Sequence, residues 1–239
     1  MTGELLIPGV CFWCAQGYSN HRTRPKVGAK GMHGFSLRLC NAAVNFPAMN
    51  ELERYISTYF GLTGSDMQEI ASHFSQTKLK KGDFFLKPGE VCRTLSFQRS
   101  GLARFYIDDG DQEVTQWISG KDGFVTDLSG LIFNLPSRSH IQALTDSDFY
   151  TIQQQDYVRL GERLPQWHHL EKLFIARCFL FMEQRIFSLL SMKAEERYHW
   201  LFNLNPELFN QVPLQYLASM MGMTPETLSR IRKKQTSLS

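Results

Sequence analysis

The sequence has few cysteines, little net charge and no long apolar run, and each scarcity excludes a class of protein. Its five cysteines, at positions 11, 14, 40, 92 and 178, are an odd number scattered over 239 residues, which argues against a disulfide framework and favours a reducing compartment. No apolar run reaches the ~18 residues of a membrane span, and no basic start followed by an apolar segment predicts a signal peptide. We therefore expect a cytoplasmic protein with no membrane partner.

What is present fits a folded globular protein. Hydrophobic residues make up 43% of the chain and charged residues 21%, and 18 phenylalanines can supply a core, so neither bulk disorder nor a collagen-like repeat fits. The net charge of +3 is too small to indicate nucleic acid, but residues 230–239 hold four basic side chains and no acidic one. The C-terminal end is therefore the candidate surface for an anionic partner.

Residues 1–48 differ from the rest of the chain. Glu4 is their only acidic residue, and no helical or strand period lasts more than a few residues. Their basic residues are Arg22, Arg24, Lys26, Lys30 and Arg38. Because Met49 then opens a clean amphipathic segment, we expect 1–48 to be a disordered tail or sequence upstream of the true start.

Residues 49–160 predict two helices followed by a small β-roll. Apolar residues recur at three- and four-residue spacing between 50 and 76, and Ser65 and Asp66 are candidates to cap the second helix. Short strands then alternate with turn sequences, and turns about every eight to twelve residues favour an antiparallel barrel or jelly roll. The candidate strands are Thr94–Phe97, Leu102–Ile107, Glu113–Ile118 and Ile141–Leu144.

Residues 161–193 predict a long helix, from about Leu164 to Lys193, with two apolar stripes. A helix that is apolar on two faces needs two partners. The roll can cover one face, and the same helix of a second chain would cover the other, which predicts a homodimer. The alternative is a helix fully buried in one larger core. One stripe is Ile175, Phe179, Met182, Ile186 and Leu189, and the other is Leu173, Leu180 and Phe187.

Residues 194–239 contain the strongest pattern, a helix-turn-helix over Val212–Lys234. Pro213 suits the first turn of one helix, and Gly222 can take the left-handed conformation that ends it. Thr224 is the candidate N-cap of the next helix, with Pro225 at its first position. A helix-glycine-helix unit of this length is typical of DNA-binding proteins.

The exposed residues of the second helix then predict contacts to double-stranded DNA. Those in its first half would meet base edges, because Glu can accept from a cytosine amino group and Arg can bridge the O6 and N7 of guanine. The predicted base-contacting residues are Glu226, Thr227, Ser229 and Arg230. The predicted phosphate-contacting residues are Arg232, Lys233 and Lys234. Thr224, at the start of the helix, completes the predicted DNA-binding set.

In this order, the pieces from about Met49 onward resemble the Crp/Fnr family of bacterial transcription regulators. Thr224, Glu226, Thr227, Leu228, Ser229 and Arg230, within MGMTPETLSRIRKK, match the family's recognition helix. The resemblance implies an α+β fold with an N-terminal antiparallel, cyclic-nucleotide-binding-like β-roll, a long dimerisation helix and a C-terminal winged helix-turn-helix. It implies a non-enzymatic homodimer that binds DNA and RNA polymerase. Pro225 replaces a family arginine that touches DNA, so the site preference should differ, and 195–211 is short for a full wing.

The family's nucleotide cassette is altered in this chain. Thr126 and Asp127 occupy its Gly-Glu positions, and Ser137 and Arg138 fall at its Arg-Ser positions. Thr126 lacks the backbone freedom of glycine. The chain's own Arg-Ser pair, Arg138 and Ser139, comes one residue late, and an arginine shifted by one residue on a strand points to the other face unless a bulge absorbs the extra residue. The alternative is that Asp127 and Arg138 form a surface pair. We expect no standard cyclic AMP site; the effector, if any, is an unidentified small molecule, and no cofactor or metal is assigned.

Three alternatives remain open at this stage. The chain can be a small-molecule sensor acting through protein partners, against which the basic terminal helix argues. It can be an iron–sulfur redox sensor, in which Cys11 and Cys14 with CxxC spacing would combine with Cys40 and Cys92. A cupin-like metalloenzyme would need clustered histidines, and only His140 lies in the strand region.

Overall fold

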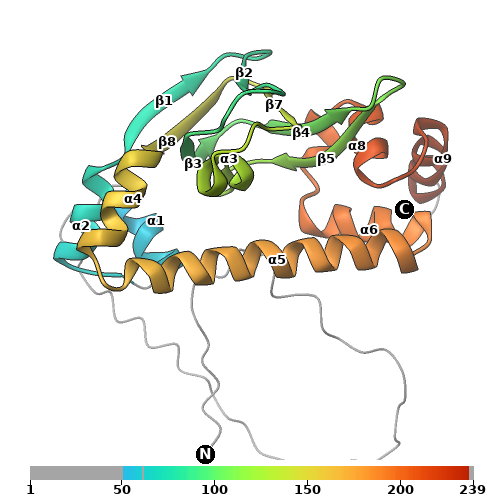
Figure 1. Ribbon diagram of the computed structural model, residues 1–239. Coiled ribbons are helices and arrows are strands. Elements are labelled where there is room, and N and C mark those ends of the chain that lie inside the picture. The colour runs from blue at the N-terminus through green and yellow to red at the C-terminus, as the bar shows by residue number, and fades with distance from the viewer. Residues whose placement is uncertain (1–50, 61, 237–239) are drawn as a thin grey trace, which may run out of the picture.

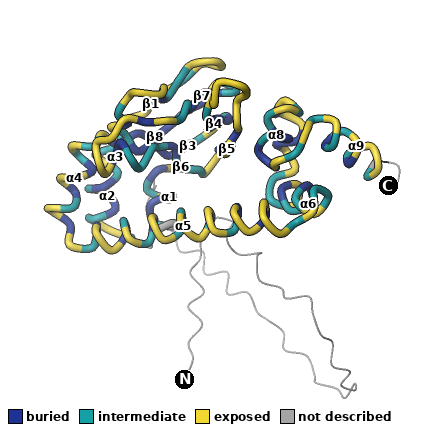
Figure 2. Tube along the Cα trace, turned by 45° about the vertical axis from the view of Figure 1, so that its right-hand side comes forward, coloured by how far each residue is buried: buried dark blue, intermediate teal, exposed yellow. Residues whose placement is uncertain are grey.

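The computed structural model describes residues 51–60 and 62–236. The predicted tail, 1–48, lies outside these residues. Two β-sheets lie over a long helix, α5, which runs beneath the whole molecule, with α1, α2 and α4 at one end and α6, α8 and α9 at the other (Figure 1). The burial colours show that α5 stays exposed along much of its length (Figure 2).

The sheets form the antiparallel roll that the sequence predicts, with strand orders β1-β8-β3-β6 and β2-β7-β4-β5. A β-bulge between Phe105 and Tyr106 interrupts the pairing of β4 with β5, and β5 is an edge strand. Short α3 (Leu128–Phe133) follows β6. The strands are β1 (Ser75–Leu79), β2 (Phe84–Leu86), β3 (Thr94–Ser100), β4 (Ala103–Asp108), β5 (Glu113–Ser119), β6 (Phe124–Val125), β7 (His140–Ala143) and β8 (Ser147–Gln153).

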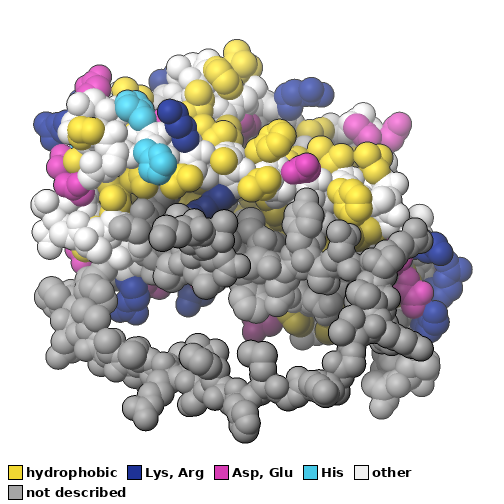
Figure 3. Space-filling model, turned by 90° about the horizontal axis from the view of Figure 1, so that it is seen from below, with side chains coloured by type: hydrophobic (Ala, Val, Ile, Leu, Met, Phe, Trp, Pro, Cys, Tyr) yellow, Lys and Arg dark blue, Asp and Glu magenta, His cyan; other side chains and the backbone are white. Residues whose placement is uncertain are grey.

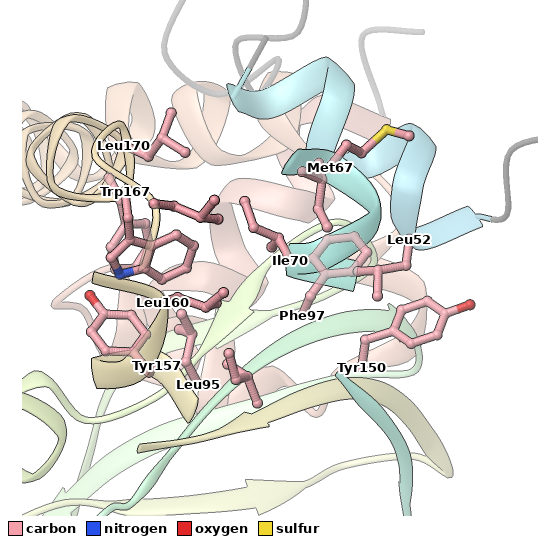
Figure 4. Close-up of a cluster of buried hydrophobic side chains, with 14 of the residues drawn as sticks. Leu52, Met67, Ile70, Leu95, Phe97, Tyr150, Tyr157, Leu160, Trp167 and Leu170 are labelled. Atoms are coloured by element: carbon pink, nitrogen blue, oxygen red, sulfur yellow. The ribbon is translucent and has the colours of Figure 1, made fainter. Parts of the chain in front are cut away.

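A hydrophobic core joins one sheet to the helices beside it (Figure 4). Leu95 and Phe97 from β3 pack in this cluster with Ile70, Leu160 and Trp167. The helices involved are α1 (Glu51–Phe60), α2 (Ser65–Ser72), α3, α4 (Gln154–Arg163) and α5 (Trp167–Ser191). This core anchors the N-terminal half of α5 to the roll.

Helix α5 begins and ends inside the range predicted for it. Leu164 is extended, with φ −110° and ψ 105°, because Pro165 disfavours helical geometry at the residue before it. At the other end, Lys193 is the N-cap of α6 (Ala194–Leu204), and its backbone N–H donates to Glu196 Oε2 at 2.7 Å. A break therefore separates α5 from the C-terminal domain.

The face of α5 that packs on the molecule corresponds to neither predicted stripe. Its buried residues are Trp167, Leu170, Phe174, Arg185 and Ser188. Phe179 is 69% exposed, and Leu180 and Phe187 from the other stripe are 55% and 56% exposed. Phe179, Leu180 and Phe187 therefore face solvent, so the expectation that the roll covers one of the two stripes is wrong, and the helix is not fully buried within a single chain.

The C-terminal part of the structure is helical. It consists of α6, α7 (Leu208–Gln211), α8 (Leu214–Met220) and α9 (Pro225–Thr236). No strand occurs between residues 194 and 236, so the helix-turn-helix lacks a wing in this range. Its core includes Leu102 and Ile118 from the roll, so the two domains share buried apolar surface. None of the helices among the described residues qualifies as a membrane span.

Candidate nucleic-acid interface

The turn between α8 and α9 has the geometry that the sequence predicts. Gly222 takes φ +62°, the left-handed region that favours glycine. The Gly222 N–H donates to the Ser219 carbonyl at 3.0 Å, and the Met223 N–H donates to the Ala218 carbonyl at 3.0 Å. This pair of bonds is a Schellman motif, which satisfies carbonyls left free at the end of α8.

Helix α9 starts and packs as expected. The Thr227 N–H donates to Thr224 Oγ1 at 3.3 Å, so Thr224 caps the helix. Pro225 is its first residue. Leu228 and Ile231 are buried against the preceding helices. The cap and these two side chains fix which face of α9 is presented outward.

One exposed face of α9 borders an open groove of about 470 Å³. Four of the predicted DNA-contacting residues line it, and they are joined by Leu214 and Pro225. These four are Glu226, Ser229, Arg230 and Lys233. Hydrogen-bond acceptors, hydrogen-bond donors and cations therefore lie side by side along one groove.

The other four predicted residues lie off this groove. Thr224 and Thr227 hydrogen-bond to each other at the cap. Arg232 is half-buried. Lys234 Nζ forms an ion pair with Glu195 of α6 at 3.1 Å, so its charge is partly neutralised within the protein.

The start of α9 favours the ionised form of Glu226. Its pKa is lowered from its ordinary value because its own backbone N–H and the Thr224 hydroxyl donate hydrogen bonds to the carboxylate. An ionised carboxylate only accepts hydrogen bonds. Glu226 is therefore suited to face a donor group, such as an exocyclic amine.

Two arginines from other helices hold the end of α8. The Arg185 Nη2 of α5 donates to the carbonyls of Met220 at 2.9 Å and Gln116 at 3.0 Å. The Arg197 Nε of α6 donates to the Met221 carbonyl at 2.7 Å. Both cations lie where the helix dipole is negative, so the helix-turn-helix is fixed to α5, α6 and strand β5 together.

The structure brings three of the four residues predicted for an effector pocket into one region of the roll. Asp127 caps α3, accepting from the backbone N–H of Ser129 at 2.8 Å and from the Ser129 hydroxyl. Burial tends to raise the pKa of Asp127, but hydrogen bonds from Ser129 and Ser137 outweigh it, so the pKa is lowered. The Thr126 hydroxyl donates to the Thr94 carbonyl at 2.8 Å.

Arg138 stands apart from this group. Its side chain is exposed, whereas neighbouring Ser137 is buried and its hydroxyl accepts from the Ser139 N–H at 3.0 Å. The side-chain oxygens of Thr126, Asp127 and Ser137 thus each form a hydrogen bond with a backbone group of the protein itself. Whether they also take part in ligand binding stays a prediction.

The residues required by the redox and metal alternatives lie mostly elsewhere. Cys11, Cys14 and Cys40 are outside the described residues. Cys92 is buried, with its thiol directed at the Thr94 carbonyl at 3.4 Å. Within the described ranges, no group of three or more His, Cys, Asp or Glu side chains is arranged to hold a metal ion.

Two residues of this region were not predicted from the sequence. Leu214 lines the groove, whereas the apolar spacing of α8 favours a buried position for it. Arg185 lies in a helix whose apolar periodicity dominates the pattern, and its partners are backbone carbonyls distant in sequence. Periodicity has no signal for such a contact.

Neither a protein-family model nor a curated protein matches the chain by sequence. Solved structures do match its fold. FixK2 from Bradyrhizobium japonicum matches with a TM-score of 0.61 and 16% identity, over 69% of this chain and 85% of that one. A putative Crp/Fnr-family regulator from Eubacterium rectale matches with a TM-score of 0.59 and 17% identity, over 77% and 88%.

The c-di-GMP-responsive global regulator CLP from Xanthomonas campestris is also similar, with a TM-score of 0.57 and 17% identity over 72% of this chain and 91% of that one. At these identities the likeness concerns the fold. The chain has the Crp/Fnr-type fold, with a cyclic-nucleotide-binding-like β-roll and a C-terminal helix-turn-helix domain.

Proposed function

We propose that this chain, which has the fold of the Crp/Fnr regulators, is a DNA-binding transcription regulator and not an enzyme. The observation that carries the proposal is the exposed face of α9 that borders the protein's surface groove. This face presents Glu226, Ser229, Arg230 and Lys233. A recognition helix in the major groove reads bases with its N-terminal residues. Cytoplasmic location and contact with RNA polymerase belong to the same proposal.

We also propose that the active form is a homodimer joined through α5. The side chains of one stripe on this helix are apolar and exposed, and a band of hydrophobic side chains follows the face seen in Figure 3. Continuous exposed apolar surface of this kind is unusual on a monomer. Two copies paired along it would place their recognition helices for a two-fold symmetric site. The stripe is Ile175, Phe179, Met182, Ile186 and Leu189.

Selection of bound DNA from a random duplex library tests this function. The expected result is an enriched two-fold symmetric sequence whose half-sites are centred about 34 Å apart, one turn of DNA. In the Arg230→Ala variant, the preference should relax at one base pair per half-site. Recovery of no sequence preference by the wild-type protein would contradict the proposal and favour a sensor that acts only through protein partners.

The altered cassette predicts that cyclic AMP binds weakly or not at all. The Asp127 carboxylate already caps α3, and Arg138 is exposed. A ligand at one hundred times its dissociation constant stabilises a fold by about 2.7 kcal/mol. Thermal melting with micromolar cyclic AMP should therefore show no shift, and a clear rise in melting temperature would contradict this prediction.

A further inference from the structure

The strongest unexplained feature is a buried arginine between the roll and the helix-turn-helix. Arg104 of β4 is 1% exposed. Its guanidinium lies 4.1 Å from the ring centre of Tyr106, also on β4, and 3.7 Å from that of Tyr216 on α8. The arginine is thus in contact with one aromatic ring from each domain.

The roll fixes the position of this guanidinium. Arg104 Nε donates to Thr115 Oγ1 at 2.9 Å, and Nη1 forms an ion pair with Glu113 Oε2 at 2.6 Å. Tyr106 is itself stacked on His140, with ring centres 4.6 Å apart and planes inclined by 8°. Tyr216 therefore meets a guanidinium whose position is set by side chains of strands β4 and β5.

A second bond between the domains lies beside the stack. The Thr115 N–H, on the edge strand β5, donates to Ser219 Oγ of α8 at 2.9 Å. Thr115 thus bonds Arg104 with its side chain and Ser219 with its backbone. Together with Arg185, which donates to carbonyls of β5 and α8, these contacts define the angle at which α8 meets the roll.

A buried ion is a poor means of gaining stability, because its desolvation offsets much of the attraction to its partners. An apolar side chain would fill the same space. A planar guanidinium bonded through two nitrogens instead fixes how its partners are oriented, because only one orientation keeps both polar bonds and both ring contacts. The arrangement is suited to fixing geometry.

We propose that Arg104 is a positioning residue for DNA recognition: it fixes the orientation of α8 and α9 against the roll and so sets the separation of the two recognition helices in the dimer. The inference rests on the proposed function. Arg104 acts through Tyr216 and does not touch DNA. When the two helix-turn-helix domains of a dimer have a fixed orientation, binding of one half-site presents the second domain to the other half-site at a high effective concentration. This gain occurs only at one half-site spacing.

The experiment compares duplexes of a selected site with half-sites at the selected spacing and with one base pair added or removed. Arg104→Lys retains the charge but loses the planar fork, and Tyr216→Leu removes the ring from the other domain. Tyr216→Phe retains the ring and serves as the conservative rescue. Arg93→Lys, at an exposed arginine of the roll, is the matched control. Thermal melting of each variant reports folding separately.

Arg104→Lys and Tyr216→Leu should each lose about tenfold in affinity at the selected spacing, the size of one such contact. They should lose much less at the altered spacings, so the penalty for wrong spacing shrinks. Tyr216→Phe and Arg93→Lys should match the wild type. If Arg104→Lys does not fold, the two Tyr216 variants decide the question.

Equal losses at every spacing would assign Arg104 a merely structural role and overturn the inference. A Tyr216→Leu variant with the affinity and the spacing preference of the wild type would also overturn the inference, provided that the wild-type protein binds its selected site. Absence of specific binding by the wild type would instead overturn the proposed function, and this inference with it.

Discussion

Arg230 and Lys233 line the same groove, but we expect them to make different contacts with DNA. Arg230 lies in the first half of α9 and can bridge two acceptors of one guanine. Lys233 lies one turn later, where the helix would leave the base edges of the DNA major groove and face the phosphates. Arg230→Ala should cost about 1–3 kcal/mol on the selected site and relax preference at one base pair per half-site. Titration against a panel of single-base variants measures this, and an equal loss on every sequence would make Arg230 a phosphate contact.

The two neighbouring lysines provide a matched pair. Lys233 is exposed in the groove, whereas Lys234 is paired with Glu195. Lys233→Ala should weaken specific and random DNA alike and lower the slope of log affinity against log salt by about one unit. Lys234→Ala should change that slope less. Affinities measured at several salt concentrations decide this, and a larger effect at Lys234 would show that the Glu195 pair opens on DNA.

Asp127 offers a prediction that depends on pH. Asp127→Ala removes the cap of α3 and should lower the free energy of unfolding by about 1 kcal/mol at pH 7. The pKa of Asp127 is lowered in the folded state, so its contribution is complete above the unfolded value of about 3.9 and is lost as the pH falls through the folded pKa. Urea unfolding of the wild type and of Asp127→Ala should show that their difference in free energy of unfolding is smaller in acid than at pH 7. An equal difference at both pH values would contradict the role of Asp127 as the cap.

At the scale of elements, the helix-turn-helix was predictable because its signals are local. Gly222, Thr224 and Pro225 each determine a backbone conformation within a few residues of themselves. The runs between turns predict four of the eight strands in the described residues, β3, β4, β5 and β7, but they do not identify β1, β2, β6 and β8. The start of α5 is predicted too early, at about Leu164, because apolar periodicity does not register that Pro165 disfavours helical geometry at the residue before it.

The surface of α5 that packs on the roll was not predictable. Apolar residues occur nearly all around this helix, so periodicity cannot distinguish the face with Trp167 and Phe174 from the face with Phe179. The contacts of Arg104 and Arg185 are tertiary, and a strand or helix pattern treats such residues as solvent-facing. Base-contacting roles depend on which face of α9 the packing leaves exposed, and that face is fixed by the burial of Leu228 and Ile231.

The turn itself predicts the effect of a glycine substitution. Alanine at 222 would adopt φ +62° and bring its Cβ to 3.0 Å from Leu189 Cδ2, so Gly222→Ala should lower the free energy of unfolding by about 1–2 kcal/mol. Gly120→Ala is the control, because its Cβ would meet only Leu102 Cδ2 at an ordinary 3.4 Å. Denaturant unfolding of the two variants compares them, and equal stability would contradict the strained geometry assigned to position 222.

At the scale of the whole molecule, the exposed stripe of α5 predicts the assembly. Introducing two charges by Phe179→Glu and Ile186→Glu should give folded monomers, because a paired apolar seam cannot bury unpaired carboxylates. Val158→Glu is the control, since Val158 is 54% exposed, much as Ile186 is at 53%, but lies on α4. Light scattering at micromolar concentration measures the mass. A monomeric wild type, or a dimeric double variant, would contradict pairing through this stripe.

The central claim is that two copies joined along α5 read one two-fold symmetric DNA site. Sedimentation of a selected duplex titrated with protein tests it most directly, because the mass of the complex counts the chains bound. The account predicts a complex of two chains on the intact site, formed in one step, and a large loss of affinity when one half-site is scrambled. One chain per duplex, or equal affinity for the intact and scrambled sites, would contradict it.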